Sequence, residues 1–146
     1  MNYFKYKGIV CNMQFMEKEI NIPSRIENLR EVEKLIDEVT NECKLSSDKY
    51  GNVFIATLEA ANNAILHGNK LDEKKDVNIR FSWSEKELNL TVIDQGKGFD
   101  YKNIPDPTSP DNVEKVNGRG VFLMVKLADK IVFNKNGRVV NLTFNL

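Results

Sequence analysis

The sequence predicts an α/β two-layer sandwich in which helices cover one face of a mixed, largely antiparallel sheet. Two helical segments precede two closely spaced segments of alternating hydrophobicity, and a second strand pair follows a third helical segment. The chain has 146 residues, of which 41% are hydrophobic and 29% charged, as is usual for one globular domain. We therefore expect a single domain over residues 1–146, with residues 1–12 as an N-terminal extension.

The first half of the chain contains one expected strand and two expected helices. Loose alternation over residues 13–22 indicates the strand, and Ser24 followed by Glu27 has the spacing of a helix capping box. Apolar residues then recur every three or four positions until about residue 44, which indicates one face of a helix. These residues are Leu29, Val32, Ile36, Val39 and Cys43. A second helix is expected to end near His67, with an apolar face of Phe54, Leu58, Ala61 and Ile65.

The second half contains two expected hairpins separated by a lid and a helix. Residues 77–83 and 88–94 alternate cleanly around a short turn, which predicts an antiparallel hairpin. Residues 96–120 show no periodicity and include three prolines, which is typical of a functional lid. Helical spacing resumes from Gly120 to about Ala128. Asn136-Gly137 is then a strong hairpin-turn signal between strands at 131–133 and 138–146.

Composition excludes several classes of protein. Twenty-one Lys and Arg residues balance twenty-one Asp and Glu residues, whereas nucleic-acid binding favours a clustered basic excess. One histidine and two cysteines without C-x-x-C spacing cannot assemble a Cys/His zinc site of the usual ligand count. No apolar run approaches the roughly 18 residues of a membrane span, and the first residues lack the apolar stretch of a signal peptide. We expect a cytoplasmic protein that binds neither nucleic acid nor membrane.

The second predicted helix carries the first candidate motif. Glu59 and Asn63 are four residues apart, so both side chains project from one stripe of the helix. The carboxylate could accept a proton, and the carboxamide oxygen could bind Mg²⁺, which prefers few protein oxygens together with water and phosphates. A solvated polar stripe is the ordinary alternative explanation.

Two glycine-containing motifs follow. Asp94, at the end of a strand, can accept a hydrogen bond from an exocyclic amine such as that of adenine, and Gly96 and Gly98 allow the backbone to approach a flat ligand. Gly118 and Gly120 open a helix, whose N-terminus favours phosphates. Arg119 could add a charge-assisted contact to a phosphate. A strand-to-loop turn and a flexible helix start are the ordinary alternatives. The sequence contains neither a P-loop motif nor a dinucleotide-binding motif.

Taken in order, the three motifs resemble those of the GHKL ATPase superfamily, which includes gyrase, histidine kinases and MutL. Glu59-x-x-x-Asn63-Ala64-x-x-His67 resembles the N box of its anti-sigma-factor kinase branch. Asp94-x-Gly96-x-Gly98 resembles the first glycine box, and Gly118-x-Gly120 resembles the second. The resemblance covers roughly residues 22–146 and implies the Bergerat ATP-binding fold.

The resemblance also implies roles for these residues. Asn63 would bind Mg²⁺, Asp94 would receive the adenine amine, and Glu59 would be the general base. Gly96 and Gly98 would shape the adenine pocket, and Gly118 and Gly120 would lie against the phosphates of ATP. The nucleotide site is completed by residues in or beside the boxes, namely His67, Phe99, Arg119 and Val121.

Glu59 stands where histidine kinases usually have a histidine, which favours the anti-sigma-factor branch of serine/threonine protein kinases. The implied partner is a STAS-domain anti-anti-sigma factor, phosphorylated on Ser or Thr. Sequestration of a sigma factor and formation of a homodimer are left open. Two alternatives remain at this point: a nucleotide-dependent binding switch without phosphotransfer, and a slow ATPase in which Glu59 activates water.

Overall fold

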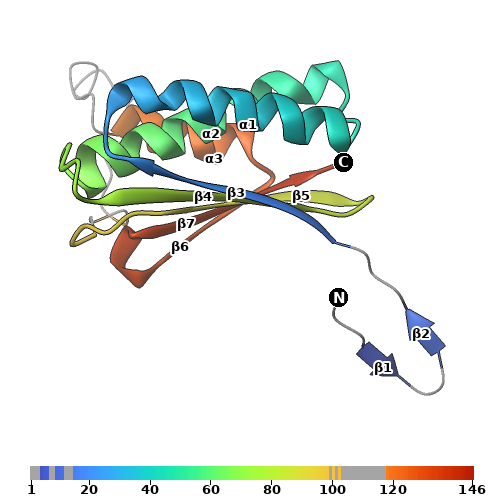
Figure 1. The fold of residues 1–146 in the computed structure, drawn as a ribbon. Helices are drawn as coiled ribbons and strands as arrows, with labels where there is room; N and C mark the ends of the chain where they lie inside the picture. Colours follow the sequence, from blue (N-terminus) through green and yellow to red (C-terminus); the bar gives the residue numbers. More distant parts are fainter. Residues whose placement is uncertain (1–3, 7–8, 12–14, 99, 101, 103–117) are drawn as a thin grey trace.

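The computed structural model describes residues 4–6, 9–11, 15–98, 100, 102 and 118–146. Seven strands and three α-helices lie in these ranges (Figure 1). The strands are β1 (Phe4–Tyr6), β2 (Ile9–Cys11), β3 (Met16–Pro23), β4 (Asp76–Trp83), β5 (Glu87–Ile93), β6 (Lys130–Asn134) and β7 (Val139–Asn145). The helices are α1 (Leu29–Glu42), α2 (Ser47–Asn63) and α3 (Arg119–Leu127). Most of the expected lid between residues 96 and 120 lies outside the described residues.

Five of the strands form one sheet in the order β3-β4-β5-β7-β6. Every pairing in this sheet is antiparallel, and the register aligns buried residues, for example Ile79 with Val92 and Leu90 with Leu142. Figure 1 shows α1, α2 and α3 on one side of this sheet. The expected two-layer α/β sandwich is therefore confirmed, as are both hairpins. β1 and β2 pair with each other in a separate two-stranded sheet.

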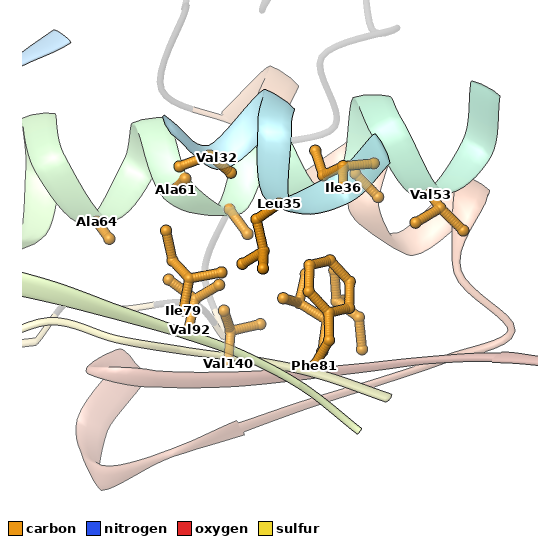
Figure 2. Packing of buried hydrophobic residues seen from close by; sticks show 14 of the residues in the cluster. Val32, Leu35, Ile36, Val53, Ala61, Ala64, Ile79, Phe81, Val92 and Val140 are labelled. Carbon is orange, nitrogen blue, oxygen red and sulfur yellow. The ribbon is translucent and has the colours of Figure 1, made fainter. Parts of the chain in front are cut away.

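The core lies between the helical layer and the inner face of the sheet (Figure 2). On α1 the buried side chains include the expected Val32, Ile36 and Val39, and Leu35 joins them. They face alternate residues of β4, of which Ile79 and Phe81 are fully buried. Burial of one such side chain contributes roughly 1.5–3 kcal/mol. The apolar face of α1, which repeats every 3.6 residues, therefore packs on the apolar face of β4, which repeats every two residues, as the sequence predicts.

Helix α2 packs between α1 and α3, so it buries a broader surface than the sequence predicts. Ala61 and Ile65 are buried as expected, but Phe54 and Leu58 are only partly buried. Small residues that the predicted face omits are buried instead: Val53, Ala56, Thr57, Ala60 and Ala64. A helix with neighbours on two sides has no single apolar stripe, and the small side chains allow close approach of those neighbours.

The end of α2 departs from regular helix geometry. From Ala64 to Gly68 the chain forms one π-helical turn, in which the Asn69 N–H donates to the carbonyl of Ala64 at 2.8 Å. Lys70 and Leu71 then adopt positive φ angles of 52° and 60°. Single π turns often occur where a helix must aim side chains at a functional site. The predicted helix end near His67 thus lies inside this π turn.

The capping box predicted at Ser24 and Glu27 is wrong. A short 3₁₀ turn, Ile26–Asn28, precedes α1, and Asn28 occupies the N-cap position without a side-chain hydrogen bond to the helix. Ser24 is instead buried, and its Oγ donates to the carbonyl of Lys75 at 2.6 Å while it accepts from Nδ2 of Asn69 at 2.8 Å. The hydroxyl makes a long-range contact because β3 and β4 pair directly at this point.

Asn69 is the centre of a buried polar network that connects three segments. Its Nδ2 donates to Ser24 and to the carbonyl of Asp76 at 3.0 Å, and its Oδ1 accepts from the N–H of Gln95 at 2.7 Å. Gln95 Oε1 in turn accepts from the N–H of Asp76 at 2.8 Å. The side chain of Asn69 therefore fixes the loop after α2 to the start of β4 and to the chain that follows β5.

We expect Asn69→Ala to destabilise the fold by about 3 kcal/mol, because the buried hydroxyl of Ser24 and two part-buried backbone groups would each lose a hydrogen bond. Chemical denaturation of the nucleotide-free protein measures this loss. Asn52→Ala, at an exposed position on α2, is the control and should cost nothing. Equal unfolding free energies for Asn69→Ala and the wild type would contradict the structural role of the network.

Within the described ranges, no helix has the length and apolar composition that a transmembrane segment requires.

Candidate nucleotide site

A cavity of about 170 Å³ opens between the helical layer and the sheet. Its polar lining side chains are Asn63, His67, Asp94 and Arg138, and Gly137 contributes backbone. The remaining lining residues are apolar: Ala60, Ala64, Val92, Val121, Met124, Phe133 and Val140. Four predicted site residues therefore come together in one cavity: Asn63 from α2, His67 from the π-helical turn after it, Asp94 from the chain after β5, and Val121 from α3.

Asp94 is the buried carboxylate of this cavity, with 8% of its surface exposed. Burial raises the pKa of its carboxyl above the ordinary value, whereas the Gly96 N–H and the charges of Arg138 and Lys75 lower it. The Gly96 N–H donates to Oδ1 at 2.8 Å. The backbone of Gly68 also packs against the carboxylate, so closely that a Cβ there would lie 2.4 Å from Oδ2. A desolvated acceptor held in this way is suited to a buried donor such as an amine.

Gly98 and the turn between β6 and β7 define the next part of the site. Gly98 has a φ angle of +87°, and a Cβ on it would lie 2.0 Å from the carbonyl oxygen of Asn136. Asn136 and Gly137 also have positive φ angles, 58° and 85°, which confirms the predicted turn. Gly98 is thus required both for its backbone conformation and for close packing. The neighbouring predicted residue Phe99 lies outside the described residues.

The first turn of α3 packs directly against the predicted catalytic stripe of α2. A Cβ on Gly120 would lie 2.7 Å from Oε2 of Glu59 and 3.1 Å and 3.2 Å from the side-chain amide atoms of Asn63. Gly118 is the N-cap of α3, and Arg119 is its exposed first residue. Glu59, Asn63 and the N-terminus of α3 are therefore adjacent, as the order of the motifs predicts.

This arrangement fits a magnesium-bound nucleoside triphosphate. The unpaired N–H groups of a helix N-terminus attract phosphate, and a carboxamide oxygen beside them can bind Mg²⁺. Within the described part of the chain, no cluster of three or more His, Cys, Asp and Glu side chains could hold a metal ion by itself. A magnesium ion bound by Asn63 would accordingly take its other ligands from phosphate oxygens and water.

Sequence reasoning missed two features of the site. Arg138 lines the cavity, and no local pattern marks it, because it precedes β7 and has an α-helical backbone conformation. No local pattern marks Asn69 either, because its burial depends on contacts with residues more than 20 positions away.

Comparisons with known proteins identify the family of this chain. A family model described as a histidine kinase-like ATPase domain matches residues 22–144. The serine-protein kinase RsbW of Bacillus subtilis is 29% identical over 132 residues, which cover 86% of this chain and 82% of that protein. The serine-protein kinase RsbW of Bacillus licheniformis is 30% identical over 119 residues, which cover 77% and 74%.

A solved structure shows the same fold. The crystal structure of the RsbU and RsbW domains of a Mycobacterium tuberculosis protein matches with a TM-score of 0.62 at 18% identity. The match covers 88% of this chain and 32% of that chain. The family expected from the three motifs is confirmed: the chain belongs to the histidine kinase-like ATPase domain family, and its relatives there include the RsbW serine-protein kinases.

Proposed function

We propose that this protein is an ATP-dependent serine/threonine kinase that phosphorylates a STAS-type anti-anti-sigma partner. One observation carries the proposal: Glu59 and Asn63 contact the first turn of α3, beside a cavity that contains the buried carboxylate of Asp94. Such a site provides separate groups for the general base, the magnesium ion and the phosphates. The similarity to RsbW serine-protein kinases supports this choice over other ATP-binding classes.

Each residue has a distinct task in this proposal. Asp94 accepts a hydrogen bond from the adenine amine, and Asn63 would hold Mg²⁺. The N–H groups at the start of α3, with Arg119 nearby, bind phosphate. ATP supplies the phosphoryl group when it is bound. Glu59 accepts the proton of the incoming hydroxyl of the partner protein. Most of the rate enhancement would come from positioning and charge neutralisation, with the general base as a smaller contribution.

Mixing the purified protein with Mg-ATP and its cognate STAS partner tests the proposal. We expect phosphate transfer to one Ser or Thr of the partner, detected by mass spectrometry. Partner binding that responds to nucleotide without transfer would overturn the kinase proposal in favour of a binding switch. Steady phosphate release without a protein acceptor would overturn it in favour of a slow ATPase. Retention of a sigma factor added to the same mixture would show the sequestration that the relatives' branch suggests.

Gly120→Ala tests the contact between α3 and the catalytic stripe. The new Cβ would displace the carboxylate of Glu59, and a misplacement of about 1 Å can cost on the order of 100-fold in rate. We expect a reduced transfer rate in a folded protein, because alanine is compatible with the helix. The measurement is single-turnover phosphotransfer.

Gly51→Ala is the matched control for that substitution. Nothing lies within 4 Å of a Cβ at this exposed position of α2, so it should stabilise the helix by about 1 kcal/mol and leave transfer unchanged. A wild-type transfer rate in Gly120→Ala would contradict the proposed packing of Glu59 against α3.

A further inference from the structure

Two residues of opposite charge line the cavity beside each other. Asp94 and Arg138 both line it, and the backbone N–H of Asp94 donates to the carbonyl of Arg138 at 3.0 Å. The salt bridges between described residues do not include Arg138. The Nε of Arg138 donates to the carbonyl of Lys135 at 3.2 Å, which anchors the guanidinium and leaves its two terminal nitrogens as donors.

The pairing of β5 with β7 places Arg138 beside Asp94. Ile93 pairs with Val139 in the register of β5 and β7, so Arg138 lies opposite Asp94 just beyond the last strand pair. Val140, two residues further along, is buried and lines the same cavity. Arg138 itself precedes β7 in an α-helical backbone conformation and is exposed, so it lines the cavity at its rim. The cavity therefore has an acceptor and a donor next to each other where β5 ends and β7 begins.

This combination matches one edge of adenine. The exocyclic amine is a donor, and ring nitrogens that are acceptors, N1 and N7, flank it on either side. We propose that Arg138 donates a hydrogen bond to a ring nitrogen beside the exocyclic amine, while that amine donates a hydrogen bond to Asp94. The two side chains together then recognise adenine. Guanine has a carbonyl oxygen in place of the amine, and Asp94 would repel it in the same pose.

A role for Arg138 in binding phosphate is less consistent with the structure. The phosphate-binding groups lie at the start of α3, against Glu59 and Asn63. A phosphate close enough to Arg138 would also approach the carboxylate of Asp94, and the two negative charges would repel each other in a desolvated pocket. A neutral base with both donor and acceptor atoms meets no such penalty.

The inference rests on the proposed ATP site and is tested by a double-mutant cycle between protein and ligand. Dissociation constants of wild type and Arg138→Met are measured by calorimetry with ATP, 1-deaza-ATP and 7-deaza-ATP. We expect Arg138→Met to bind ATP roughly 10–100-fold more weakly, as for the loss of a hydrogen bond from a charged donor. One of the two analogues, the one that lacks the nitrogen bound by Arg138, should bind wild type more weakly than ATP does by a similar factor. The affinity of Arg138→Met for that analogue should be no lower than the affinity of wild type for it.

Arg80→Met is the matched control. It removes the same charge from an exposed site on β4, where Arg80 pairs with Glu17 and Glu19, and it should not change the affinity for any of the three ligands. If each analogue loses the same affinity relative to ATP in wild type and in Arg138→Met, the inference is overturned and the proposed ATP site is unaffected. A wild type that binds no adenine nucleotide would overturn both.

Discussion

Asp94→Asn is expected to weaken ATP binding by at least about 100-fold, because a buried charged acceptor is replaced by a neutral group that also carries a donor. The amide of asparagine would either turn its NH₂ group toward the adenine amine or provide only a weaker acceptor. The backbone contact from Gly96 can be kept by the amide oxygen, so the pocket retains its shape. Isothermal titration with Mg-ATP measures the effect.

The same substitution should leave the nucleotide-free fold as stable as wild type, or more stable. The pKa of Asp94 is raised in the folded state, chiefly by burial. A raised carboxyl pKa means that the folded protein binds the proton more tightly than the unfolded chain does. The contribution of Asp94 to stability therefore falls as the pH rises from below its unfolded pKa to above its folded pKa. At neutral pH the ionised side chain opposes folding, and asparagine removes that effect.

Calorimetric unfolding without nucleotide, at neutral pH, checks this second expectation. An Asp94→Asn protein that unfolds at a clearly lower temperature would show that the carboxylate serves the fold. An Asp94→Asn protein that binds ATP like wild type would show that the adenine ring binds elsewhere. The combination of lost binding and retained stability is the signature of a side chain kept for a ligand.

Glu59→Gln is expected to reduce phosphotransfer by roughly 10²–10⁴-fold, the usual contribution of a general base. Glutamine has nearly the same shape, so the packing against Gly120 should persist and ATP affinity should change little. Single-turnover transfer to the partner protein and calorimetric titration with Mg-ATP measure the two quantities separately.

Glu85→Gln, in the exposed turn between β4 and β5, removes the same charge at the opposite end of β5 from Asp94 and serves as the control. It should transfer phosphate like wild type. Glu59→Gln with an undiminished transfer rate would exclude Glu59 as the base. A fall in ATP affinity that accounts for the whole loss of activity would make Glu59 a nucleotide-binding residue instead.

Local patterns in the sequence predict most of the elements correctly. The alternation of Val77, Ile79 and Phe81 reflects burial on one face of β4, and it needs no knowledge of the partner strand. Asn136-Gly137 specifies its turn through the backbone alone. The three motifs lie in the expected elements because each includes the turn or helix end that positions it.

Features that depend on distant neighbours could not be predicted in this way. Ser24 has the local signature of a helix cap, but the buried Asn69, 45 positions later, provides a stronger partner. The buried face of α2 is broader than its periodicity indicates because α1 and α3 pack on both sides. Arg138 could not be predicted from strand alternation, because it precedes β7 and has an α-helical backbone conformation.

The most direct test is a crystal structure of the protein with Mg²⁺ and a non-hydrolysable ATP analogue. We expect the adenine amine within hydrogen-bond distance of the Asp94 carboxylate, and Mg²⁺ about 2.1 Å from the side-chain oxygen of Asn63. The phosphates should lie against the first turn of α3. Electron density for the base on another surface, or a magnesium ion without Asn63 among its ligands, would contradict the proposed site.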